Sequence, residues 1–225
     1  MKKFFTVALM ILFAAQICYA EPPQAMQRET AKSRARQSFN LCSVEGAWYE
    51  VYIVGEKEKI WVDWQWARND EVFTANYHAY LGKDYSSSLA LQNVELFGRY
   101  GKDNQRINMT SPNRDGFSVV RGVNGLPDLL VSKIQVTGGG GFEMKIFAVK
   151  NGQLRVVKSF VKDKKTLNES FITISTPTTY LDNGTISIPW HTNAMPGAGS
   201  YVTVYMFDVQ NLILIPAYTN KIPRQ

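Results

Sequence analysis

The chain has 225 residues, with 25 lysines and arginines against 19 aspartates and glutamates, and a formal net charge of +6. A chain of this length buries roughly 70% of the surface that its unfolded form exposes, so one domain can build a complete hydrophobic core without staples. Only two cysteines are present, which excludes a disulfide-rich scaffold.

The first twenty residues have the pattern of a secretory signal peptide. Lys2 and Lys3 form a basic start, residues 4–15 are an apolar run interrupted only by Thr6, and the segment ends at the small residue Ala20. The apolar run is too short to span a membrane as a helix, which needs about 20 residues, and no second run follows. We therefore expect cleavage after Ala20, no transmembrane segment, and a periplasmic or extracellular protein. The short Lys-Lys start is typical of bacteria.

Residues 21–40 are predicted to form a flexible basic tail or a frayed helix. They carry four cations against two acids, include Pro22 and Pro23, and contain few large apolar side chains that could offset the entropy of ordering. Residues 41–225 are predicted to form a single β-rich domain. Cys42 begins this domain without a cysteine partner, and its apolar surroundings favour a buried, inert thiol.

The first predicted unit of the domain is a hairpin of residues 48–54 and 60–66 around a charged loop at 55–59. In the second strand, alternation groups the side chains into two faces. The expected core face consists of Ile60, Val62, Trp64 and Trp66. The other face consists of Trp61, Asp63 and Gln65.

The rest of the chain is predicted mainly as short strands joined by turns. Residues 69–97 fit either strands or at most one or two short helices. Asn151-Gly152 is the strongest hairpin signal in the chain. Strands are expected at 117–123, 129–137, 142–150, 154–161, 171–175, 185–190, 201–209 and 212–217. The fold class is therefore mainly β, as an antiparallel sandwich, an open barrel or partial propeller-like blades.

One stretch resembles a known repeat. Residues 124–131 are NGLPDLLV, followed by SKIQVTGGGGFEMKIFAVKNGQL. About residues 120–154 thus resemble the FG-GAP or VCBS repeats of β-propellers in exported bacterial proteins, in which a loop precedes an apolar strand and a Gly-rich turn. The family loop often supplies several carboxylates to calcium. Here only Asp128 and the neutral Asn124 stand in such positions, so we expect no calcium site.

No catalytic, metal or cofactor site is expected from the residue pattern. Only two histidines, His78 and His191, are available for a nucleophilic mechanism or for zinc, and neither has the necessary neighbours in sequence. The four glycines at 138–141 lie between two predicted strands without a following helix, so a β turn is favoured over a phosphate loop.

Aromatic side chains provide the candidate ligand-binding residues. Tyr49 and Trp61 can stack on sugar rings or on a partner if they lie on the outward face of the first hairpin. The long loop at 190–200 adds Trp190 and His191. The alternative is that these side chains serve packing, or that the loop is an ordinary surface loop.

The leading functional hypothesis is an exported, non-catalytic module that binds an unidentified protein or glycan. Two alternatives stay open at this point: a hydrolase acting on polysaccharide or cell wall, and a periplasmic inhibitor or adaptor of another protein. A hydrolase would need paired carboxylates, for which Asp63, Glu95 and Asp128 are candidates. Nucleic acid is not an expected partner of an exported protein.

Overall fold

The computed structural model describes residues 21–63, 70–102, 105–109, 116–135, 141–174, 177–192 and 198–223. These residues form a mainly β protein with one helix and two sheets, and one of the two sheets is nearly closed and barrel-like. The first sheet and its helix comprise β1 (Ala25–Gln27), α2 (Arg28–Arg34), β2 (Ala35–Cys42), β3 (Trp48–Asp63), β4 (Asp70–Lys83), β5 (Ser88–Leu91) and β6 (Arg106–Asn108). The second comprises β7 (Gly116–Val120), β8 (Leu129–Gln135), β9 (Phe142–Lys150), β10 (Gln153–Val161), β11 (Thr166–Asn168), β12 (Phe171–Thr173), β13 (Thr179–Tyr180), β14 (Ile186–Thr192), β15 (Gly199–Asp208) and β16 (Ile213–Lys221).

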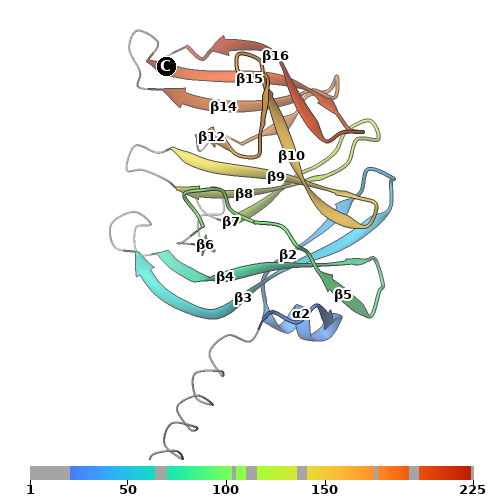
Figure 1. Cartoon of the computed structure of the whole chain (residues 1–225). Coiled ribbons are helices and arrows are strands. Elements are labelled where there is room, and N and C mark those ends of the chain that lie inside the picture. The colour runs from blue at the N-terminus through green and yellow to red at the C-terminus, as the bar shows by residue number, and fades with distance from the viewer. Residues whose placement is uncertain are drawn as a thin grey trace, which may run out of the picture.

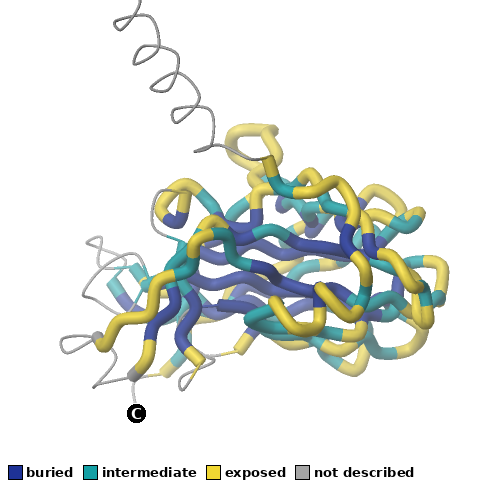
Figure 2. The backbone as a smooth tube through the Cα atoms, turned by 90° about the horizontal axis from the view of Figure 1, so that it is seen from below, coloured by how far each residue is buried: buried dark blue, intermediate teal, exposed yellow. Residues whose placement is uncertain are grey.

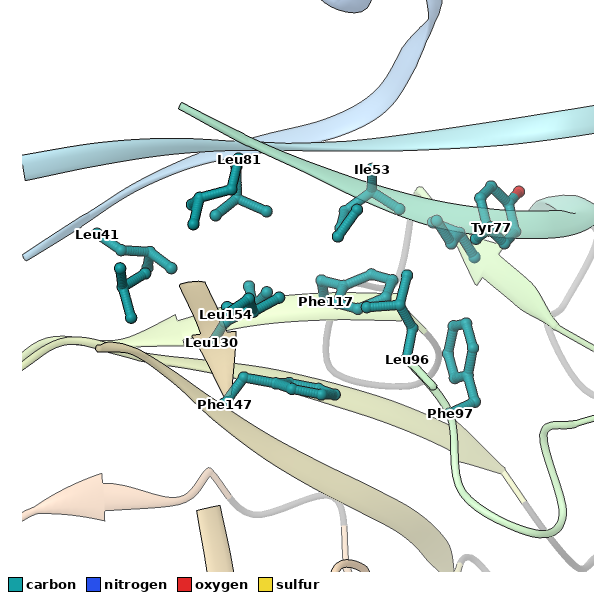
Figure 3. Close-up of a cluster of buried hydrophobic side chains, with 14 of the residues drawn as sticks. Leu41, Ile53, Tyr77, Leu81, Leu96, Phe97, Phe117, Leu130, Phe147 and Leu154 are labelled. Atoms are coloured by element: carbon teal, nitrogen blue, oxygen red, sulfur yellow. The ribbon is translucent and has the colours of Figure 1, made fainter. Parts of the chain in front are cut away.

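The sheets form layers, with the β7–β8–β9 part of the second sheet in the middle (Figure 1). One core lies between this middle layer and the first sheet, where Leu41, Ile53 and Leu81 face Leu130 and Phe147 (Figure 3). A second core lies between the middle layer and β14–β16, and a third, smaller one beneath α2. The middle strands are therefore covered on both faces, which explains why nearly every residue of β8 and β9 is buried. Figure 2 shows the buried segments running through the interior of the molecule, with exposed segments around them.

The second sheet curves until its ends nearly meet. β10 pairs in parallel with β16, with Ser159 opposite Leu214, whereas the other pairings in this sheet are antiparallel. β12 pairs with β9, and the hydroxyl of Thr173 in β12 donates to the carbonyl of Pro189 in β14 at 2.6 Å. Neighbouring strands in the order β14–β15–β16–β10–β9–β12 thus surround the second core almost completely.

The expected mainly β fold and its hairpin turn are confirmed. Asn151 and Gly152 join β9 to β10 with φ of +52° and +70°, the two positive values that a type I′ turn requires. Strands occur close to the predicted bounds throughout the second half of the chain. Within residues 70–97 the structure forms β4 and β5, so the strand alternative holds there and the helix alternative is wrong.

The predicted hairpin at 48–66 is wrong. Residues 48–63 form one long strand, β3, which pairs with β4 along its whole length. The charged residues 55–59 are accommodated in a bulge instead of a loop, because β3 has one more residue than β4 between the Glu56 and Lys59 pairs. Ile60 and Val62, predicted for the core face, are 61% and 39% exposed. Trp64 and Trp66 lie outside the described residues.

The segment expected to be a tail carries regular structure. β1 pairs with β5, α2 packs on the first sheet through the fully buried Ala31, and β2 pairs with β3. Arg28 forms an ion pair with Glu50 and donates to the carbonyl of Ser86 at 2.6 Å. Arg28 and Arg36 therefore have tertiary partners, which composition alone does not reveal.

Candidate functional site

The edge of β4 carries two adjoining hollows. β4 pairs with β6 through Val72–Thr74 and with β5 through Tyr80–Leu81, which leaves residues 75–79 between the two short strands. Gln105 spans part of this interval, because its carbonyl accepts from the Ala75 N–H at 3.3 Å and its side chain accepts from the Tyr77 N–H at 2.7 Å. The hollows have volumes of about 600 and about 590 Å³, and Asn76, Lys102 and Gln105 line both.

The bulge in β3 shapes the first hollow. Lys57 has a φ of +52°, and the bulge brings lysines together with the exposed indole of Trp61. Gly55 permits the two strands to approach at this point, since a Cβ there would lie 2.8 Å from the Cβ of Ala75. Besides the three shared residues, the lining consists of Glu56, Lys57, Lys59, Trp61, Thr74 and Ala75.

A polar triad on the other side of the bulge holds it in place. The Glu58 carboxylate accepts from Arg36 Nε at 2.9 Å and from the Tyr77 hydroxyl at 2.9 Å. The Arg36 guanidinium also lies over the Phe73 ring, 4.0 Å from its centroid. The hydrogen bond to Glu58 raises the pKa of Arg36, and burial raises the pKa of Tyr77. Both groups therefore keep their protons at neutral pH, and the triad is a fixed support for the hollow.

The second hollow lies between β4 and residues 92–97. His78 lines it, and its Nε2 is 3.5 Å from the Glu56 carboxylate of the first hollow. On the opposite wall Glu95 forms an exposed ion pair with Lys102 at 3.9 Å. The two hollows thus contain both lysines and carboxylates, and Asn76 and Gln105 contribute side-chain amides to the lining that the hollows share.

Buried polar side chains of the middle layer anchor the wall of the second hollow. Ser132 Oγ donates to the Leu96 carbonyl at 2.6 Å, and Lys145 Nζ donates to the Glu95 carbonyl at 2.8 Å. The Glu143 carboxylate accepts from the backbone N–H groups of Arg99 and Tyr100 at 3.0 and 2.8 Å. Burial lowers the pKa of Lys145. These bonds explain why three polar residues occupy a strand pair that is buried on both faces.

Of the four predicted ligand-binding residues, Trp61 alone lines a hollow, whereas the candidate carboxylate Glu95 and His78 line the second one. Tyr49 lies toward the other end of β3 and packs half-buried against the first core. Trp190 belongs to the second sheet, stacks on Tyr201 with ring centroids 4.8 Å apart, and donates its indole N–H to Thr203 Oγ1 at 2.9 Å. His191 Nδ1 lies 3.1 Å from the Ser200 hydroxyl. The structure therefore does not bring Trp61 together with Trp190 and His191.

Sequence reasoning missed the residues at the junction of the hollows. Asn76 is one polar residue within an alternating strand, and Lys102 and Gln105 lie in a long connection without a motif. The one available signal was the amide-rich composition of residues 92–105, which is common in surface loops and does not identify a site.

Comparisons with protein families, with characterised proteins and with solved structures found no match to this chain. The resemblance of residues 120–154 to FG-GAP or VCBS repeats therefore stays a prediction. In the described part of the chain, no helix is both long and apolar enough to cross a membrane.

Asp128 is the one carboxylate in the loop that resembles FG-GAP or VCBS repeats, and other groups of the protein donate hydrogen bonds to it. Its Oδ1 accepts from the Gly122 N–H at 2.8 Å, and its Oδ2 accepts from the Cys42 N–H at 3.0 Å and from Arg121 at 2.7 Å. Asp128 is only 4% exposed. Nearby Cys42 is half-buried, and burial together with the Asp128 charge raises the pKa of its thiol. The thiol therefore stays protonated near neutral pH, as an inert cysteine does.

Calcium should not change the stability of this protein. Hydrogen-bond donors already occupy both oxygens of Asp128, and a calcium site needs 6–8 oxygen ligands. Thermal melts in millimolar calcium and in EDTA should agree within error. A rise of several degrees with calcium would contradict this expectation, because binding to the native state raises stability by mass action.

Proposed function

We propose that this chain is an exported, non-catalytic module that binds an extended glycan along the two hollows at the edge of β4. The observation that carries the proposal is the combination of an exposed indole, Trp61, with the amides of Asn76 and Gln105 at the junction. An indole face stacks on a sugar ring, and amide groups both donate to and accept from sugar hydroxyls.

The charged side chains that line the hollows favour a glycan ligand that carries acidic groups. Lys57, Lys59 and Lys102 line the hollows together with Glu56 and Glu95. Of these carboxylates, Glu95 already has a cationic partner in Lys102. The cations exceed the acids among these five side chains, which favours carboxylate or sulfate groups on the ligand.

Removing the Trp61 side chain should weaken glycan binding at least tenfold with little loss of stability. Trp61 is 39% exposed, so most of its contribution is expected in the complex and not in the core. The measurement is co-sedimentation of the purified protein with insoluble neutral and acidic polysaccharides, followed by titration with soluble fragments of the one that binds best. Denaturant melts of the same Trp61→Ala protein check its stability.

Trp48→Ala is the matched control. Trp48 lies on the same strand, is 49% exposed, and lines neither hollow. This variant should bind as the unchanged protein does. Equal losses in both variants, or no loss in Trp61→Ala, would contradict the proposed site. Release of shortened fragments from the bound polysaccharide would contradict the non-catalytic role.

A further inference from the structure

A separate small cavity lies on the far side of the middle layer. It has a volume of about 170 Å³ and is situated between the β7–β8 pair and the segment that leads into β13. Neither hollow of β4 shares a lining residue with it. Its lining includes Ser118, Val120, Val131, Lys133, Pro177 and Thr178.

Lys133, one of the lining residues, carries a poorly satisfied ammonium. The residue is only 7% exposed, because β8 is covered on both faces. Its Nζ donates to the Ile174 carbonyl at 3.5 Å, the outer limit of a hydrogen bond, and lies 5.8 Å from the centroid of the Phe142 ring. Among the residues that the structure describes, no carboxylate lies within 4.0 Å of this Nζ. An ammonium has three donors, and the described residues provide an acceptor for one of them.

A second lining group, the hydroxyl of Thr178, is also weakly satisfied. Thr178 is 6% exposed, and its hydroxyl donates to the sulfur of Met144 at 3.4 Å, although a thioether is a poor acceptor. Ser118 contributes a further hydroxyl to the lining. Valines form much of the remaining wall. The cavity therefore combines one cation, two hydroxyls and an apolar surface in a space that suits a molecule of a few carbon atoms.

We propose that this cavity binds a small monocarboxylate, with the carboxylate at Lys133 Nζ and the alkyl part against Val120 and Val131. A buried cation is stable only when it is paired or hydrogen-bonded, and a carboxylate supplies the missing countercharge and acceptors. Burial lowers the pKa of Lys133, in keeping with the distant hydrogen-bond acceptor of its ammonium. The hydroxyls of Ser118 and Thr178 can donate to the second carboxylate oxygen.

The volume limits the size of the ligand. A water molecule takes up about 30 Å³ of the liquid, so the cavity of about 170 Å³ holds roughly six waters or one molecule of comparable size. Acetate and propionate fit this limit, and we use them as probes. The neutral amide acetamide has nearly the shape of acetate but lacks its charge, so it separates charge recognition from simple filling of the cavity.

The test is a titration of the isotope-labelled full chain with sodium acetate and sodium propionate, followed by amide NMR spectra at constant ionic strength. The expected result is a saturable change in the amides of Val131, Lys133 and Thr178, with acetamide at least tenfold weaker. Lys133→Met should abolish saturation, whereas replacement of the surface lysine Lys165 with methionine should leave it unchanged. Trp61→Ala should also leave it unchanged, because the glycan site is separate.

Several outcomes would overturn the proposal. These are the absence of saturation in the unchanged protein, equal responses to acetate and acetamide, or full acetate binding by Lys133→Met. The NMR spectrum itself reports whether the variant is folded. If Lys133→Met does not fold, Thr178→Val replaces it, with an expected loss of at least threefold in acetate affinity; unchanged affinity in that variant would count against the proposal.

Discussion

Replacement of Phe147 with alanine should lower the free energy of unfolding by about 3–5 kcal/mol. Phe147 is fully buried in the core between the first sheet and the middle layer (Figure 3). It lies in β9 opposite Leu130 of β8 on one side and Val156 of β10 on the other. Removal of the ring therefore leaves a cavity between two sheets that secondary-structure hydrogen bonds hold in position. Urea unfolding followed by tryptophan fluorescence measures the change.

Tyr100→Ala is the control for the loss of an aromatic ring. Tyr100 is 59% exposed, and its interaction with Glu143 uses the backbone N–H, which the substitution preserves. Its effect should be within about 0.5 kcal/mol of zero. If Phe147→Ala cost as little as Tyr100→Ala, the packing of the middle layer against the first sheet would be refuted.

Replacement of Asp128 with alanine should lower the free energy of unfolding by about 2–6 kcal/mol, because two half-buried backbone N–H groups lose their acceptor at roughly 1–3 kcal/mol each. These are the N–H groups of Cys42 and Gly122. The Cys42 carbonyl in turn accepts from the Asp128 N–H at 3.0 Å, so this residue pair connects the end of β2 to the start of β8 and thus joins the two sheets. The ion pair with Arg121 should add little, since that guanidinium is 59% exposed.

Two further variants make this prediction specific. Asp182→Ala removes an exposed carboxylate from a turn and should change stability by no more than about 0.5 kcal/mol. Asp128→Asn keeps one acceptor oxygen and should fall between the alanine variant and the unchanged protein. Equal unfolding midpoints for Asp128→Ala and Asp182→Ala would show that the carboxylate does not connect the sheets. Denaturant melts of all three proteins at one pH provide the comparison.

The second half of the fold could be predicted from local sequence signals. Asn151-Gly152 dictates a two-residue hairpin because few other residue pairs accept two positive φ angles. The β-branched and aromatic residues on either side of it form β9 and β10 close to the predicted bounds. These signals depend on neighbours in the chain, so they do not require knowledge of the tertiary structure.

In the first sheet, by contrast, the burial of a side chain depends on whether another layer covers its face of the sheet. Alternation correctly indicates that Ile60 and Val62 share a face, but it does not say whether another layer covers that face. β3 is long, and at its far end these two side chains stay exposed. Likewise, β1, α2 and β2 form in the expected tail because β5 and β3 offer pairing partners.

The sequence by itself determined a β-rich chain, its tight turns and the exposed aromatic Trp61 as a candidate for binding. The tertiary structure decided which polar residues are buried and which groups they contact. Glu143, Lys145 and Lys133 are three charges in consecutive strands, and nothing in their spacing distinguishes them from surface residues. They are buried because β8 and β9 lie between two layers, so Glu143 and Lys145 anchor a loop on one face and Lys133 reaches a cavity on the other. Burial is a property of the layers that surround a strand, and a single strand does not encode it.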